Sequence, residues 1–202
     1  AFYATAALIT SHIREVKLIF SQALAPVAAR HHAAGESAEF EAVLGRVSRW
    51  TTSLAVPIIF LAFVMRDDIM VLVDPSYTGD TRFMLVLLLP PFLSCAFGLA
   101  GNSIVFCGHS RWNLFNSILV AGLNTAFNLW LIPRHGLLGA AVATAMAASC
   151  VTALQLIELR ALEGVWLRPS AVWQPHLGLY LGLGALFLLW DPARLATWPL
   201  RL

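Results

Sequence analysis

Long apolar runs separated by short polar stretches dominate the chain. Six segments stand out in the hydropathy pattern, at residues 2–29, 47–65, 83–107, 112–132, 137–159 and 173–190. Apolar runs near 20 residues match the roughly 30 Å hydrocarbon core of a bilayer. The pattern therefore predicts an all-α integral membrane protein built as a bundle of about six transmembrane helices, each crossing the membrane as part of a multi-pass chain.

Prolines and glycines interrupt several of these segments. Pro57 lies inside the second segment, Pro90 and Pro91 lie inside the third ahead of Gly98, and Pro133 is expected to end the fourth. A proline inside a lipid-embedded helix removes a backbone donor, so neighbouring groups or cavity water must satisfy the freed carbonyl. Such breaks are common where a bundle bends around a cavity.

The longest polar connection, Arg30 to Arg49, has helical character of its own. Phe40, Leu44 and Val47 recur there at helical spacing among alternating acidic and basic residues. That pattern fits an interfacial amphipathic helix. It fits equally well a solvated helical extension of the second span, and the sequence leaves both interpretations open.

Composition supports the membrane interpretation and excludes several functions. Hydrophobic residues make up 59% of the chain and charged residues 12%, about half the charge of a soluble domain. The formal net charge is only +2, and no basic run is interleaved with aromatic residues, so we do not expect nucleic-acid binding.

No catalytic motif is present, so we do not expect an enzyme or a cofactor. The chain has no GxSxG, P-loop, HExxH or glycine-rich dinucleotide turn. The cysteines, Cys95, Cys107 and Cys150, lie in apolar stretches without CxxC spacing, which favours neither a disulfide framework nor a metal site. His31 and His32 form a pair in a polar connection, where we expect them to be solvated.

Two cations interrupt the first segment, which we interpret as one broken span. Arg14 and Lys17 lie three residues apart and share a helix face with Ser21, whereas Glu15 points elsewhere. A cation at mid-membrane costs roughly 2.5–3.5 kcal/mol on insertion scales, so it usually faces a cavity or a partner. These side chains could bind a shared anion in a cavity, or they could snorkel to an interface.

The fourth segment carries a stripe of amides. Asn113, Asn116, Asn124 and Asn128 follow one another at helical intervals, with Val120 in the same row. They could hydrogen-bond sugar hydroxyls in a wet cavity, with Asn116, Asn124 and Asn128 as the substrate-binding candidates. They could equally tie neighbouring helices together.

Small residues mark expected helix contacts in the fifth and sixth segments. Gly139, Ala143 and Ala147 share one face of the fifth segment, and Gly178 and Gly182 repeat the spacing in the sixth. Such faces let helix backbones approach closely in a membrane. We interpret them as packing surfaces.

Several short runs resemble one known family. They are Ser21-Gln22-Ala23-Leu24-Ala25-Pro26-Val27, Gly35-Glu36, Asp74-Pro75-Ser76-Tyr77, Gly108-His109-Ser110-Arg111, and the stretch from Leu123 to Thr144. The last is similar to the signature "LN…LN…LIP-x-(Y/F)-G-(I/L)-x-GAA-x-AT", with His135 where an aromatic residue is usual. The resemblance, which covers nearly all of residues 1–170, is to the polysaccharide transporter family of Wzx-type lipid-linked oligosaccharide flippases, within the multidrug/oligosaccharidyl-lipid/polysaccharide exporter superfamily.

The resemblance implies a two-lobed transporter of 12 to 14 spans, of which residues 1–170 would form most of the C-terminal lobe. Residues 171–202 would add a C-terminal span or part of a terminal helix pair. Such proteins move an undecaprenyl-pyrophosphate-linked oligosaccharide across the bacterial inner membrane by alternating access. The product would feed surface polysaccharide such as lipopolysaccharide O-antigen or exopolysaccharide, with polysaccharide polymerase and synthesis machinery as partners. No covalent chemistry is implied, and cavity cations are common in the family, in agreement with Arg14 and Lys17.

Two other functions stay open. A cation-coupled small-molecule exporter of the same superfamily would be expected to carry acidic residues deep in its spans, and the segments indicate none. A structural membrane subunit of a polysaccharide synthesis complex would be expected to lack a large polar cavity.

Overall fold

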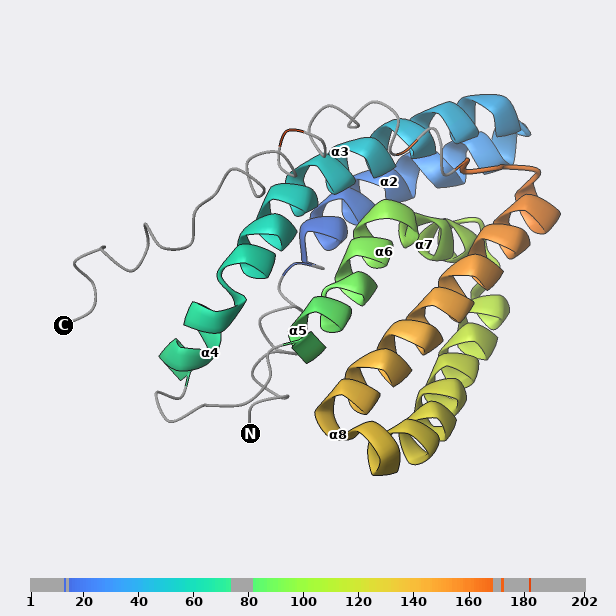
Figure 1. The fold of residues 1–202 in the computed structure, drawn as a ribbon. Helices are drawn as coiled ribbons and strands as arrows, with labels where there is room; N and C mark the ends of the chain where they lie inside the picture. Colours follow the sequence, from blue (N-terminus) through green and yellow to red (C-terminus); the bar gives the residue numbers. More distant parts are fainter. Residues whose placement is uncertain (1–12, 14, 74–81, 169–171, 173–181, 183–202) are drawn as a thin grey trace.

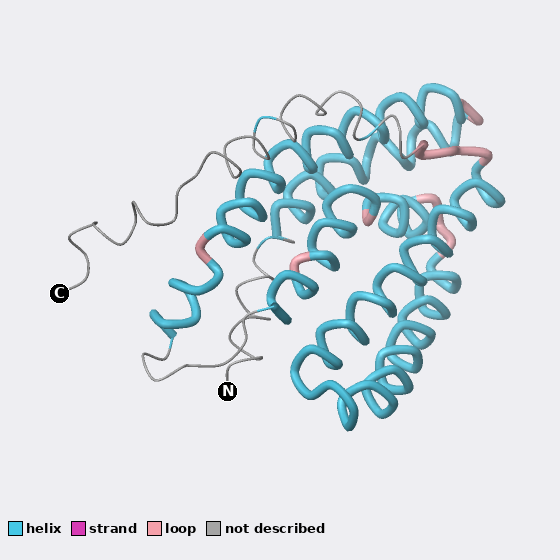
Figure 2. The backbone as a smooth tube through the Cα atoms, in the orientation of Figure 1, coloured by secondary structure: helices cyan, strands magenta, loops and turns pink. Residues whose placement is uncertain are grey.

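A computed structural model describes residues 13, 15–73, 82–168, 172 and 182. This part of the chain is helical and contains no strand (Figure 2), as the hydropathy pattern predicts. Two helices are long and apolar enough to cross a membrane, and a bent helix pair, Phe83–Phe97 with Leu99–Phe106, would bring the number to three. The predicted sixth segment, at 173–190, lies outside the described residues except at position 182.

The first two described helices, α2 (Glu15–Ala34) and α3 (Ser37–Val64), form a hairpin (Figure 1). Gly35 ends α2 with a φ of 69°, and the N–H groups of Gly35 and Glu36 donate to the carbonyls of His32 and His31 at 3.1 and 3.0 Å. These two bonds form a Schellman cap, in which glycine takes the left-handed conformation at low cost.

The continuity of α3 decides between the two interpretations of the polar connection. Residues 37–49 belong to the same helix as the second apolar segment, so the helical extension is correct and a separate interfacial helix is wrong. Phe40 and Leu44 are buried at the helix–helix contact, which explains why their helical spacing suggested an amphipathic helix.

The third apolar segment is divided into three short helices, which follow α4 (Arg66–Val73). These are α5 (Arg82–Leu87), α6 (Leu89–Phe97) and α7 (Leu99–Phe106). Pro90 and Pro91 stand in the first turn of α6, where a missing N–H costs nothing. The span Phe83–Phe97 bends by 45° into Leu99–Phe106, and we call α5, α6 and α7 together the broken span.

The last helix, α8 (Ser110–Glu163), is a helical hairpin whose two arms run side by side (Figure 1). Gly136 breaks it with φ 55° and ψ −130°. Pro133 lies within the first arm, so the prediction that this proline ends the fourth segment is wrong by three residues. Each arm of about 26 residues is roughly 39 Å long, so α8, which is one of the two helices counted above, is long enough for two crossings of the hydrocarbon core.

The broken span lies between the α2–α3 hairpin and α8 (Figure 1). Its α6 contacts α3 and α8, and its α7 contacts α2 and α8. The largest apolar cluster joins α2, α3, α7 and the end of α8, and includes Leu24, Phe40, Leu44, Leu99, Ile104 and Leu159. Large apolar side chains such as Ile19 and Leu129 are more than 70% exposed on the outside, as a lipid-facing surface requires.

Candidate functional site: a polar seam at the broken span

Lys17 lies against the bend of the broken span. Its side chain is half-buried, and its Cδ stands 3.1 Å from the place that a Cβ on Gly98 would occupy. The same Cβ would stand 2.4 Å from the Ser94 carbonyl oxygen, so only glycine fits the bend. Arg14, the other predicted cation, lies outside the described residues.

Three further polar side chains lie beside this bend. Ser21, one helical turn after Lys17, is buried and accepts a 2.5 Å hydrogen bond from Asn102 Nδ2 on α7. Gln155 on α8 places its amide 2.6 Å from the position that a Cβ on Gly101 would take. We call Lys17, Ser21, Asn102 and Gln155 the polar seam. It brings together side chains from α2, α7 and α8.

Sequence reasoning placed Lys17 and Ser21 together but missed Asn102 and Gln155. Asn102 follows directly after Gly101 in an apolar segment. This polar side chain beside a glycine was the one feature of the sequence that could have indicated it. Gln155 is a single amide in the fifth segment. Only the packing of α8 on α7 brings it to the seam.

The amide stripe divides into two separate contacts. Asn116 is 2% exposed and donates a 2.6 Å hydrogen bond to Glu158 Oε2 in the other arm of α8. Asn128 donates to Asn124 Oδ1 within the first arm, while Asn113 is exposed. Asn116 therefore ties the two arms together, and the structure does not place it in the seam.

Glu158 is a buried acidic residue near the end of the fifth apolar segment, five residues before α8 ends. It is 5% exposed in the second arm of α8. Its Oε1 and the Oδ1 of Asn116 are buried with no hydrogen-bond partner among the described residues. A buried carboxyl with one donor is costly, because each unsatisfied polar atom loses its hydration.

The small residues predicted to pack helices together are buried in the fifth segment but not at the one described position of the sixth. Gly139, Ala143 and Ala147 are all buried, and a Cβ on Gly139 would stand 2.4 Å from the Leu131 carbonyl oxygen across the hairpin turn. Gly178 lies outside the described residues. Gly182 is exposed, so the structure does not show the packing role predicted for it.

The histidine pair is not simply solvated, which corrects another expectation. His31 is 8% exposed, and its Nδ1 lies 2.8 Å from Glu36 Oε2. His32 Nδ1 lies 2.7 Å from Glu163 Oε2 at the end of α8. Each histidine thus contacts a carboxylate, and the second contact joins residues that are far apart in the sequence.

All three cysteines are free thiols, and Cys107 has an unusual environment. It follows the last residue of α7 and is buried. Burial raises the pKa of Cys107 to about 12, with further contributions from the charge of Glu163 and a hydrogen bond to it. The thiol therefore stays protonated at neutral pH unless another cation replaces the proton.

Comparison of the chain with protein-family models, curated proteins and solved structures found no match. Over the described residues the fold is all-helical, with two helices, α3 and α8, long and apolar enough to cross a membrane and the bent helices α5 to α7 packed between them.

Proposed function

We propose that this chain is part of a membrane transporter that flips a pyrophosphate-linked oligosaccharide lipid across the bacterial inner membrane. The observation that carries the proposal is the polar seam at the bend between α6 and α7. Irregular backbone at membrane depth is tolerated where it is buried in protein or lines a cavity. Transporters use such discontinuous helices to form substrate sites near the middle of the membrane.

The residues of the seam suit the two parts of such a substrate. Lys17 supplies a cation for the pyrophosphate, and as a compact ammonium it binds as a point charge. Asn102 and Ser21 bond to each other at 2.5 Å, and both groups could exchange that bond for sugar hydroxyls. The proposed class of substrate rests on the family resemblance, whereas the proposed position of its binding site rests on the polar seam.

The proposal is tested in cells that depend on the full-length protein for surface polysaccharide. Lys17→Glu should abolish the polysaccharide, because an acid at the seam repels the pyrophosphate, while Lys17→Arg should retain most of it. Arg14→Glu is expected to act like Lys17→Glu. Arg46, exposed on α3, offers the matched control, since Arg46→Glu makes the same change of charge away from the seam.

Membrane-inserted protein is quantified on the same samples. Normal polysaccharide from Lys17→Glu at normal protein level would refute the assignment of the seam to substrate binding. The snorkelling interpretation of Lys17 would then replace it.

A second function is favoured by one observation, the buried Glu158. A cation-coupled small-molecule exporter needs a carboxylate that binds its coupling ion, and Glu158 Oε1 is buried without a partner among the described residues. Glu158→Gln keeps the shape and removes the charge. Loss of drug resistance with intact polysaccharide in this variant would favour the exporter over the flippase.

A further inference from the structure

The helices α2, α7 and α8 are each followed by a glycine with a positive φ, and these three helix ends lie at the same end of the bundle. Gly35 follows α2 with φ 69°, Gly108 follows α7 with φ 88°, and Gly164 follows α8 with φ 68°. The cap at Gly108 has the same pair of bonds as that at Gly35, because Gly108 N donates to Val105 and His109 N donates to Ile104, both at 3.0 Å. These left-handed caps fix the residues beside them in position.

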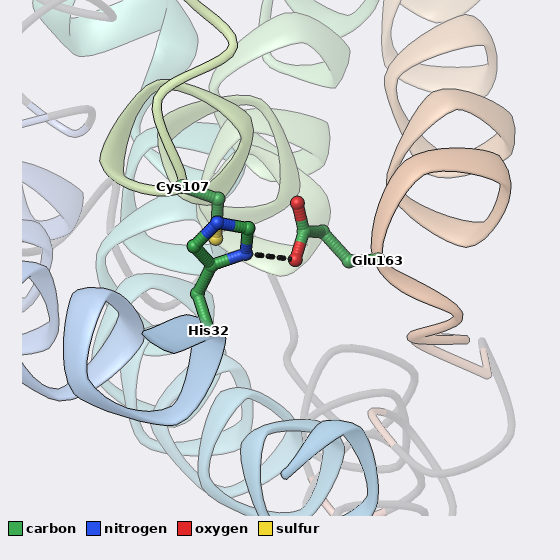
Figure 3. A group of neighbouring side chains, drawn as sticks. All are labelled: His32, Cys107 and Glu163. Carbon is green, nitrogen blue, oxygen red and sulfur yellow. Dashed lines mark hydrogen bonds and ion pairs between the residues drawn. The ribbon is translucent and has the colours of Figure 1, made fainter. Parts of the chain in front are cut away.

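Four side chains that can each bind a metal ion lie close together at these helix ends. His32 Nδ1 lies 2.7 Å from Glu163 Oε2, and His109 Nε2 lies 2.9 Å from Glu163 Oε1. Cys107 points its sulfur toward the same place, beside the His32 ring (Figure 3). One ligand atom each from His32, Cys107 and Glu163 lie within 4.8 Å of one another. We call His32, Cys107, His109 and Glu163 the end cluster.

The donor set has the chemistry of a zinc site. Imidazole nitrogen, thiolate sulfur and carboxylate oxygen are the ligands that Zn²⁺ takes in proteins, usually four in a tetrahedron. Bond lengths of about 2.0–2.3 Å in a tetrahedron place the ligand atoms of one ion roughly 3.3–3.6 Å apart. The His32 and Glu163 atoms, hydrogen-bonded at 2.7 Å without the ion, would have to move apart slightly to admit it. Cys107 and the Glu163 side chain are 5% and 7% exposed, whereas the His32 side chain is 43% exposed, so a bound ion would lie at the surface with its sulfur and carboxylate ligands buried.

We propose that the end cluster binds one Zn²⁺ ion through His32, Cys107 and Glu163, with His109 held beside them by its hydrogen bond to Glu163. Binding displaces the thiol proton of Cys107 to solvent and uses the His32 tautomer whose lone pair faces Glu163. No bond of the chain breaks and no group is oxidised or reduced. The proposal is independent of the proposed transport function, since it rests only on the geometry of the end cluster.

A metal here would join parts of the chain that are distant in sequence. The His32–Glu163 contact spans 131 residues and the His109–Glu163 contact spans 54. One ion would therefore fasten the end of α2 to the ends of α7 and α8. Closing such long loops is where a metal clip contributes most to stability.

The first test measures zinc affinity of the purified full-length protein in detergent, by competition with a chromophoric chelator after metal removal. One Zn²⁺ should bind per chain. His32→Gln and Cys107→Ser should each weaken binding by more than about 100-fold, since loss of even an outer-shell partner costs 10–100-fold. His31→Gln is the matched control, because His31 is adjacent in sequence but contacts Glu36 instead.

The buried His31 and the exposed Glu36 and Glu39 form a second group that could itself hold a metal. Zinc binding lost in His31→Gln and retained in His32→Gln would place the ion there and overturn the proposal. Absence of stoichiometric binding to the parent protein would overturn it as well.

The second test needs no variant, so it stays informative if Cys107→Ser fails to fold. Alkylation of each cysteine is measured by mass spectrometry with and without Zn²⁺. Zinc should slow labelling of Cys107 at least tenfold and leave Cys150, which is exposed on α8, unchanged. Equal labelling of Cys107 under both conditions would refute coordination by its sulfur.

Discussion

Gly139 offers the sharpest test of the α8 hairpin. A Cβ added at this position would stand 2.4 Å from the Leu131 carbonyl oxygen, 2.7 Å from its carbon and 3.1 Å from Ile132 N. Ordinary non-bonded contacts between carbon atoms lie near 3.5–4.0 Å. The two arms must therefore separate by roughly 1 Å at their turn, and because the obstructing atoms are backbone, no rotamer change can relieve the clash.

We expect Gly139→Ala to lower the free energy of unfolding by about 1–3 kcal/mol, the usual cost of overpacking. The matched control is Gly122→Ala in the first arm, where nothing lies within 4 Å of the added Cβ. That change should instead stabilise the helix by up to about 1 kcal/mol, because alanine has the higher helix propensity. The two substitutions are chemically identical, so their difference isolates the close approach.

Denaturant unfolding in detergent, followed by circular dichroism, measures both variants beside the parent. Opposite signs for Gly139→Ala and Gly122→Ala would support the hairpin geometry. Equal stability of the two variants would show that the turn at Gly136 does not bring the arms together as described.

Two further predictions follow from the buried polar groups. Asn116→Leu should lower the free energy of unfolding by about 1–3 kcal/mol, because it leaves Glu158 buried without its donor. Adding Glu158→Leu should recover most of that loss. Changes in the two single variants that simply add up in the double variant would contradict this. In the metal-free protein the pKa of Cys107 is raised from 9.0 to about 12, so the folded state keeps a proton that the unfolded chain releases. The protonated Cys107 therefore contributes to the free energy of unfolding below pH 9, and this contribution should decline as the pH rises towards 12. In denaturant titrations, Cys107→Ser should remove that part of the pH dependence.

The apolar helical segments were predictable because hydropathy and segment length depend only on the local sequence. Their ends were not. Pro133 was expected to stop the fourth segment, but a proline can remain in a membrane helix when neighbours satisfy the freed carbonyl. Gly136 makes the turn instead, because its φ of 55° is accessible to glycine and strained for other residues.

The end cluster illustrates a different limit of sequence reasoning. Short-range spacing such as CxxC identifies metal sites whose ligands share one turn. His32, Cys107 and Glu163 come from three helix ends, and only the packing of those helices brings them together. Without that packing, His32 was expected to be solvated, and the spacing of Cys107 favoured no metal site.

The polar seam and the end cluster meet on one short helix, and this relation constrains how the broken span can move. Asn102 contributes to the seam from within α7, and Cys107 follows the last residue of the same helix. A zinc ion in the end cluster would hold that end of α7 against α2 and α8. Any change of the 45° bend would then have to be taken up by α6, which contacts α3 and α8. Zinc should therefore slow transport if the flippase cycle moves α7, and should leave it unchanged if α6 alone moves.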